Sequence, residues 1–447
     1  MVKKRSWIQY SLLFSLLFLF SCGTSAEWSP AKARKLGVQV GDSEIFNSNF
    51  TGFALFDPES REWLFEHQSD KYFTPASNTK IFTFFTALHV LGDSLPVAHY
   101  VVRGDSLIFW GAGNPMTLHP DFDQEDPLLS FLRQHKDKRL FFADDNFRDD
   151  AFGPGWSWAD YIYSYQPERS SLPLYGNVVR LKKSAGEAKI RTYPAYFEGF
   201  LSRTQDPEAP ALTRARFSNA FTFRPDAWQG KSLNREIPFR YDGQTAVALL
   251  MDTLGQSVEY WEGALPAAPE QTLSMALPDT LYQRLMQDSD NFIAEQLLLM
   301  SADKLSGSLL AETAIAYAQD TLLADAPDPL YWYDGSGLTR YNMFTPRTVV
   351  HVLQRLYQDV PMGKLTAFFP NGGVSGTIRS LYAGENGEPF VFAKTGTLRN
   401  KHCLSGYLKT DSGKVLIFSF MHNNFPGSSN PIKEEMDQVL RWIKANY

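Results

Sequence analysis

The sequence predicts an α/β protein whose main domain is discontinuous and is interrupted by an inserted, mainly-β region. Helical and strand patterns occur at both ends of the 447-residue chain, whereas residues 96–274 carry short strand patterns with scattered Pro and Gly. A chain of this length can hold two or three domains. We therefore expect one domain built from residues 27–95 plus 275–447, and an insert built from residues 96–274.

The N-terminus predicts export from the cytoplasm. Basic residues at positions 3–5 precede an apolar run at 8–20, which is the order of a signal peptide and is too short to span comfortably as a membrane helix. The run ends in the sequence LFSCG, which resembles the cleavage box of a bacterial lipoprotein. We therefore expect residues 1–22 to form a signal peptide with lipoprotein-type cleavage before Cys22 and lipidation of this cysteine. The alternative is an ordinary signal peptide that is cut a few residues later.

The folded part is expected to begin with a β-hairpin followed by a helix. Strand patterns at 52–56 and 62–66 flank the turn sequence DPES. The sequence TPAS then ends at Ser77 and precedes an apolar stretch, 78–91, that lacks Gly and Pro and is typical of a buried helix. Ser77 is thus placed at the start of a helix.

The remaining elements follow the same discontinuous plan. In the insert, 100–103 and 107–110 predict a hairpin, and the linker-like composition of 263–269 predicts the end of this region. Helical patterns then lie on both sides of Ser289, between about 279 and 299. Strands at 390–394, 404–408 and 414–421, and a last helix that begins at Asn430 and Pro431, complete the domain.

Composition excludes several classes of function. The formal net charge of −6 gives no basic surface of the kind that binds phosphate backbones, so we expect no nucleic-acid partner. The eight histidines are scattered without ligand spacing, and the acidic residues between Asp121 and Asp126 are typical of a solvated loop, so neither a metal nor a cofactor is expected. Cys403 is the only other cysteine, and we expect it to be a small buried residue. If Cys22 is lipidated or removed, no intrachain disulfide can form.

Short motifs occur in the order Ser77-Asn78-Thr79-Lys80, Ser289-Asp290-Asn291 and Lys394-Thr395-Gly396-Thr397. They match S-x-x-K, S-D-N and K-T-G, the set found in penicillin-binding proteins and class A β-lactamases. An isolated S-x-x-K has little weight, because about one or two arise by chance in a chain of this size, and a second copy begins at Ser301. The order of the motifs, together with their placement at a helix start, a helix junction and a strand end, distinguishes the chosen set.

These residues supply the parts of a serine acyl-transfer reaction. Ser77 is the candidate nucleophile, and Lys80, one helical turn away on the same face, is the candidate base. Lys80 must then be a neutral amine, which requires that its pKa be lowered by burial or by a neighbouring cation such as Lys394. Ser289 would relay the proton to the departing amine, and Asn291 would hold the substrate's amide.

The third motif is expected to bind substrate. Lys394 and Thr395 would hold the substrate's terminal carboxylate, and Gly396 allows one backbone to approach another closely. The backbone N–H groups of Ser77 and Thr397 are expected to form an oxyanion hole.

The chain resembles the D-alanyl-D-alanine carboxypeptidase/endopeptidase family of class C low-molecular-mass penicillin-binding proteins (peptidase family S13). The resemblance covers nearly all of the expected mature chain. The 212 positions from Ser77 to Ser289 leave room for the large insertion of this family, which β-lactamases lack. Further segments that resemble the family lie at 153–160, 289–295, 334–340 and 373–377.

The resemblance implies a penicillin-binding-protein/β-lactamase-like transpeptidase domain and no cofactor. It implies a serine peptidase that forms an acyl-enzyme and removes the terminal D-Ala from peptidoglycan stem peptides. Cleavage of 4→3 cross-links is left as an undecided second activity. β-Lactam antibiotics would be covalent inhibitors that acylate Ser77. Asp160 best matches the acidic position that helps the family bind the free amine of the stem peptide's third residue, and a plain loop carboxylate is the alternative. The expected location is the periplasmic side of a bacterial cell envelope, with a lipid anchor in a membrane.

Two alternative functions remain. A β-lactamase of the same fold needs fast deacylation by a carboxylate-activated water, and no Glu-x-x-Leu-Asn segment lies between Ser289 and Lys394. A catalytically idle, wall-binding lipoprotein would not need the motif residues, which are all intact. The sequence predicts no particular oligomeric state.

Overall fold

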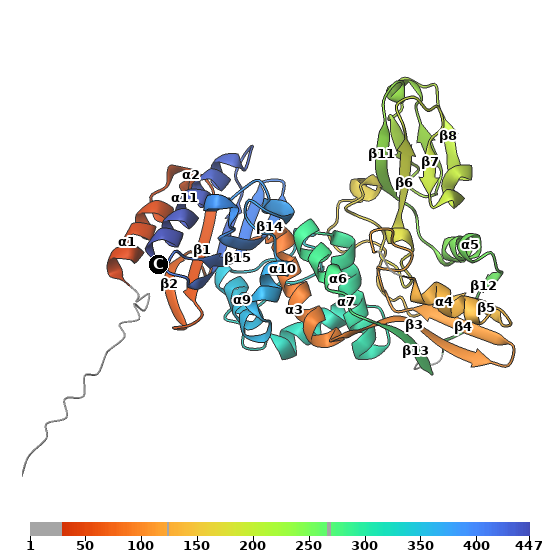
Figure 1. Ribbon diagram of the computed structural model, residues 1–447, viewed down its shortest axis with the longest axis horizontal. Coiled ribbons are helices and arrows are strands. Elements are labelled where there is room, and N and C mark those ends of the chain that lie inside the picture. Colours follow the sequence, from red (N-terminus) through yellow and green to blue (C-terminus); the bar gives the residue numbers. More distant parts are fainter. Residues whose placement is uncertain (1–28, 123–124, 266–269) are drawn as a thin grey trace, which may run out of the picture.

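The computed structural model describes residues 29–122, 125–265 and 270–447, so the prediction for Cys22 lies outside the described residues. Figure 1 shows two parts: a central sheet with helices on both faces, which contains both described ends of the chain, and a pair of smaller lobes formed by the middle of the chain.

The central sheet joins the two ends of the sequence. Its five strands lie in the order β14-β15-β16-β1-β2, and all neighbours are antiparallel. Pairing of Phe53 with Phe420 places β1 beside β16, although these strands are far apart in the chain. The predicted discontinuous α/β fold is therefore confirmed. The strands are β1 (Phe50–Asp57), β2 (Glu62–His67), β14 (Val391–Leu398), β15 (Lys401–Lys409) and β16 (Val415–Asn423).

Alternating side chains of these strands fill a core on each face of the sheet. On β16, Phe418 and Phe420 pack with one set of helices, whereas Ile417 and Met421 pack with the other set. Full burial of each such side chain contributes roughly 1.5–3 kcal/mol. The first set comprises α1 (Pro30–Leu36), α2 (Glu44–Asn47) and α11 (Asn430–Asn446), and the second comprises α3 (Thr79–Leu91), α7 (Asn291–Ser306) and α9 (Pro346–Asp359).

The helical segment around the second motif is broken at Ser289. The helix α6 (Asp279–Gln283) continues as a π-helical turn, Arg284–Asp288, and Ser289 then adopts left-handed backbone angles (φ 59°, ψ 38°). Asp290 caps α7 by accepting a hydrogen bond from the backbone N–H of Ile293. The break turns the Ser289 side chain toward Lys394, as described below. The shorter helices α8 (Ala311–Tyr317) and α10 (Met362–Phe368) complete this part.

The inserted region contains three further sheets. One has the order β12-β5-β4-β3-β13 and packs against two helices, α4 (Pro127–Gln134) and α5 (Gly243–Leu254). These helices were not part of the strand-rich prediction, and their apolar faces bury Leu128, Leu132, Leu249 and Leu250. The strands are β3 (Ser94–Arg103), β4 (Ser106–Gly111), β5 (Arg139–Ala143), β12 (Val258–Tyr260) and β13 (Gln271–Ala276).

The other two sheets have three strands each, in the orders β11-β6-β7 and β8-β10-β9. Their strands are β6 (Val178–Lys183), β7 (Arg191–Tyr193), β8 (Leu201–Arg203), β9 (Leu212–Arg214), β10 (Phe221–Phe223) and β11 (Leu233–Pro238). The start and end of the insert meet, because β3 and β13 pair as antiparallel strands. The domain boundaries near residues 96 and 274 stay a prediction.

Candidate active site

Ser77 lies on a tight turn at the start of α3. It is the middle residue of a short 3₁₀ helix, Ala76–Asn78, and Ala76 has a positive φ of 48°. Two glycines allow this turn to be packed from both sides. A Cβ on Gly337 would lie 1.9 Å from the carbonyl O of Ala76, and a Cβ on Gly396 would lie 2.3 Å from the carbonyl O of Pro75. The close approach predicted for Gly396 is therefore present.

Lys80 is fully buried and lies within hydrogen-bond distance of Ser77. Its Nζ donates to Ser77 Oγ at 3.2 Å, to Asn291 Oδ1 at 2.6 Å and to the carbonyl O of Ser336 at 2.8 Å. Three acceptors match the three N–H groups of a lysine ammonium. The structure thus brings together Ser77 from the turn before α3, Lys80 from α3 and Asn291 from α7.

Burial lowers the pKa of Lys80 from 10.5 to about 8, although the nearby carboxylates of Asp334, Glu295 and Asp290 act in the opposite direction. Burial is also the main cause of the lowered pKa of Lys394, and the positive charge of Lys80 lowers it further. Burial, one of the two causes expected from the sequence, is thus the main cause of the lowered pKa of Lys80. The repulsion between the two amines further disfavours the state in which both carry a charge.

Lys394 links the third motif to the second. Its Nζ donates to Ser289 Oγ and to the carbonyl O of Thr395, each at 2.8 Å. A second link fixes β14 against the nucleophile turn: Asn78 Nδ2 donates to the carbonyl O of Lys394 at 2.7 Å, and Asn78 Oδ1 accepts from Ser405 Oγ on β15. All three motifs therefore meet at one place.

The outer edge of β14 lies beside Ser77. β14 is an edge strand, and the outward-facing backbone groups in its first half have hydrogen-bond partners. The carbonyl O of Val391 accepts from Gly372 N, and Ala393 N donates to the carbonyl O of Pro370. Backbone groups of a strand alternate with a period of two residues, so Thr395 and Thr397 present theirs to the same edge. Gly396 contacts the backbone at Ser77. An N–H of Thr397 at this edge is suited to an oxyanion hole with that of Ser77.

The side chains of the two threonines have partners of their own. Thr395 Oγ1 donates to Thr377 Oγ1 at 2.7 Å, which brings the segment 373–377 to the same place. Thr397 Oγ1 lies 3.2 Å from Nδ1 of His402, the residue opposite it on β15.

A buried polar network beneath Lys80 was not identified from the sequence as part of the site. The Glu295 carboxylate accepts from Ser336 N at 2.7 Å, and Ser336 in turn provides the carbonyl that binds Lys80. Arg169, which comes from the insert, lies 3.6 Å from Glu295 and 2.7 Å from Asp149. The insert is thus connected to Lys80 through buried charges.

Asp334 is the second carboxylate of this network. It accepts hydrogen bonds from the Trp156 indole N–H at 2.9 Å and from the backbone N–H groups of Gly337 and Thr339. Burial, and next the charge of Asp334, raise the pKa of Glu295 to about 7. The segments around Trp156, Glu295 and Asp334, which resembled the family in sequence, therefore meet at this network.

Asp160 lies near the site. Within the described part of the chain, its side chain makes no hydrogen bond to a motif residue. It is half-buried on a 3₁₀ helix, Trp158–Ile162. Its carboxylate contributes, after burial, to raising the pKa of Tyr165 to about 12. The carbonyl O of Tyr165 accepts from Asn291 Nδ2 at 2.9 Å, so Asp160 is one residue removed from the second motif.

The competing S-x-x-K sequence has no such surroundings. Ser301 is buried inside α7 and donates to the carbonyl O of Leu297 at 2.7 Å, while Lys304 is exposed. Cys403 is buried as predicted, and burial raises the pKa of its thiol to about 12. A thiol with this pKa is a poor nucleophile at neutral pH.

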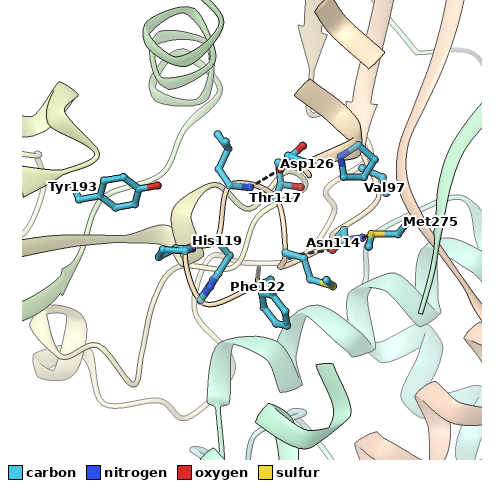
Figure 2. Close-up of a pocket in the computed structure, with 12 residues that line it drawn as sticks. Val97, Asn114, Thr117, His119, Phe122, Asp126, Tyr193 and Met275 are labelled. Carbon is cyan, nitrogen blue, oxygen red and sulfur yellow. Dashed lines mark hydrogen bonds between the residues drawn. The ribbon is translucent and has the colours of Figure 1, made fainter. Parts of the chain in front are cut away.

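Other features of the described chain lie apart from Ser77. A pocket of about 210 Å³ in the insert is lined by Asn114, His119, Asp126 and Tyr193, among others, and includes none of the motif residues (Figure 2). Within residues 29–122, 125–265 and 270–447, no group of three or more His, Cys, Asp and Glu residues is placed to hold a metal ion. No helix in these ranges is both long and apolar enough to cross a membrane.

The chain matches the family model for the D-Ala-D-Ala carboxypeptidase 3 (S13) family over residues 33–222 and 250–446. It is 31% identical over 436 residues to the D-alanyl-D-alanine carboxypeptidase DacB of Haemophilus influenzae, which covers 89% of this chain and 90% of that protein. It is 24% identical to a D-alanyl-D-alanine carboxypeptidase of Actinomadura sp. over 448 residues, 89% of this chain and 81% of the relative.

A solved structure supports the fold. The crystal structure of penicillin binding protein 4 (dacB) from Haemophilus influenzae superposes with a TM-score of 0.71 at 19% sequence identity, covering 92% of this chain and 99% of that chain. The family match, the relative that aligns along almost the whole chain and the shared fold agree with one another. The chain therefore belongs to the D-Ala-D-Ala carboxypeptidase 3 (S13) family of peptidases, and it is a hydrolase of the D-alanyl-D-alanine carboxypeptidase type.

Proposed function

We propose that Ser77 is the nucleophile of this carboxypeptidase and that Lys80 is its base. The observation that carries the proposal is the 3.2 Å contact between Lys80 Nζ and Ser77 Oγ at a buried lysine whose pKa is lowered to about 8. A neutral amine at this distance accepts the hydroxyl proton as Oγ attacks the carbonyl carbon of the penultimate D-Ala.

Acyl transfer forms one bond and breaks another. The bond from Ser77 Oγ to the carbonyl carbon forms, and the C–N bond to the terminal D-Ala breaks. The proton that Lys80 removed is returned to the departing amine, with Ser289 as the relay and Lys394, 2.8 Å from Ser289 Oγ, as its partner. Water hydrolyses the ester in a second step and regenerates Ser77.

The substrate is positioned by the remaining motif residues. Lys394 and Thr395 bind the terminal carboxylate, whose negative charge favours the charged form of the Lys394 amine despite burial. The N–H groups of Ser77 and Thr397 bind the oxyanion, and Asn291 holds the amide of the preceding residue. Asp160 is proposed to bind the free amine of the stem peptide's third residue. Its half-buried position beside Tyr165, which contacts Asn291, supports this role.

The substrate class is peptidoglycan stem peptides that end in D-Ala-D-Ala, and β-lactams act as covalent inhibitors at Ser77. A solved structure of penicillin binding protein 4 from Haemophilus influenzae is described as complexed with a novel β-lactam. Opening of D-alanyl cross-links uses the same acyl-enzyme, since only the departing amine differs. We propose it as a second activity.

The purified protein is expected to release D-Ala from a stem pentapeptide and to form a long-lived penicilloyl-enzyme, measured by amino-acid analysis and by intact mass at timed intervals. A penicilloyl-enzyme that turns over within seconds would favour a β-lactamase instead. Absence of both D-Ala release and acylation would favour an idle wall-binding protein.

We also propose that the enzyme works in the bacterial cell envelope, on the periplasmic side, held by a lipid on Cys22. The support is the basic, apolar and Leu-Phe-Ser-Cys-Gly order of the first residues. Cys22→Ser is expected to move the protein from the membrane fraction to the soluble fraction of cells, because the residue that carries the lipid is lost. Fractionation with immunoblotting measures this. Continued membrane association of the variant would contradict the lipid anchor.

A further inference from the structure

A groove that the catalytic scheme does not use lies beyond the hairpin end of β14. Its volume is about 520 Å³, and its lining includes Phe50, Tyr72, Thr74, Met343, Lys401 and Asn423. We call it the hairpin groove, because the turn between β14 and β15 borders it. Phe50 is 59% exposed, which is high for a Phe side chain. An exposed apolar wall of this kind is typical of a binding surface.

The hairpin groove is lined by two segments that also lead to the proposed catalytic residues. Thr74 precedes the nucleophile turn by two residues, and its carbonyl O lies 3.7 Å from Cys403 Sγ on β15. Lys401 pairs with Leu398, the residue that follows Thr397 on β14. The groove therefore lies beside the segment that leads to Ser77 and beside the β14–β15 hairpin.

The charge of the groove favours an anion. Its lining contains two lysines, Lys71 and Lys401, and no Asp or Glu, although the chain as a whole has a net charge of −6. Lys71 is already paired with Asp70 at 3.1 Å. Lys401 contacts the neutral side chain of Asn424, so its charge is available to a ligand. Arg399, exposed in the adjacent turn, adds to the positive potential.

In the proposed function, the bound substrate runs along β14 toward this groove. A terminal carboxylate at Thr395 and an oxyanion at Thr397 orient the substrate antiparallel to β14. Residues before the scissile bond then pass Leu398 and reach the hairpin turn, at about 3.4 Å per residue. The second and third residues upstream are thus placed near Lys401.

We propose that the hairpin groove binds the sugar-proximal half of the stem peptide through the free acidic carboxylate of that peptide. This inference rests on the proposed function and deepens it, because it assigns a preference for acidic over amidated stem peptides. Lys401 pairs with the carboxylate, and Phe50 covers the apolar side.

The test uses two pentapeptides, L-Ala-γ-D-Glu-L-Lys-D-Ala-D-Ala with its glutamyl carboxylate free, and the same peptide with that carboxylate amidated. The wild-type kcat/KM is expected to be about five- to ten-fold higher for the free carboxylate. Lys401→Gln should bring this ratio near one, and Lys401→Glu should bring it below one. Lys409→Gln, at the other end of β15, is the matched control and should keep the wild-type ratio. A structural effect would lower both rates together and leave the ratio unchanged, which would overturn the proposal.

A failure of the proposed function is distinguishable from a failure of this inference. If the wild-type protein released D-Ala from none of the peptides, the proposed function would be contradicted. The groove would then be judged by the dissociation constants of the two pentapeptides for the Ser77→Ala protein, where the same ratio and the same loss in Lys401→Gln are expected. Equal affinities for the two pentapeptides would overturn the inference.

Discussion

Ser77→Ala is expected to lower kcat for D-Ala release by at least about 10⁴-fold and to abolish covalent uptake of penicillin, because the hydroxyl that forms the ester is removed. The structure predicts little change in stability. Ser77 is half-buried at a turn that is held by Gly337, Gly396 and Asn78, and its hydroxyl contacts only Lys80 in the described chain. D-Ala release and intact mass after penicillin treatment measure the two effects.

Ser301→Ala is the matched control, since it removes the serine of the other S-x-x-K sequence. Its hydroxyl bonds to the carbonyl O of Leu297 inside α7, so its loss should leave acylation and turnover near wild-type levels. Penicillin adducts on the Ser77→Ala protein would rule out Ser77 as the nucleophile. If only Ser301→Ala lost them, the assignment would move to α7.

Much of this site could be predicted because its proposed catalytic residues lie within short sequence motifs. Ser77 and Lys80 are one helical turn apart, so their contact follows from helix geometry alone. The hairpins and the last helix were predicted from local periodicity, and the structure confirms β1, β2, β3, β4 and α11 near the expected positions. The patterns at the two ends of the chain predicted one shared domain, whereas the pairing of β1 with β16 was not predicted and is seen in the structure.

The buried network could not be predicted in the same way, because its members come from three distant segments. Arg169 reaches Glu295 only when the insert packs on α7, and Asp334 reaches Trp156 only when the loop before α9 folds beneath α3. The left-handed backbone of Ser289 is another tertiary effect, since Ser has no strong local preference for it. The resemblance of these segments to a family was the one signal available in the sequence.

The same network surrounds Lys80, the proposed base. Lys80→Met is expected to lower kcat/KM by about 10³- to 10⁴-fold, because Ser77 then lacks a base while the substrate contacts of β14 remain. The variant also leaves Asn291 Oδ1 and the carbonyl O of Ser336 without their donor, so its melting temperature must be measured beside its activity. Lys304→Met, which changes the exposed lysine of the other S-x-x-K sequence, is the matched control and should retain activity.

The pH dependence separates a base from a purely structural lysine. A neutral amine is the active form, and lowering the pKa of Lys80 from 10.5 to about 8 raises the neutral fraction at pH 7 from about 0.03% to about 10%. The wild-type kcat/KM should therefore rise about ten-fold per pH unit up to about pH 8 and then level off. The Glu295 carboxylate stabilises the charged form of Lys80, so Glu295→Gln should move this rise to lower pH, whereas Lys304→Met should not. A rise that Glu295→Gln leaves in place, or moves to higher pH, would mean that the activity follows the ionisation of a group other than Lys80.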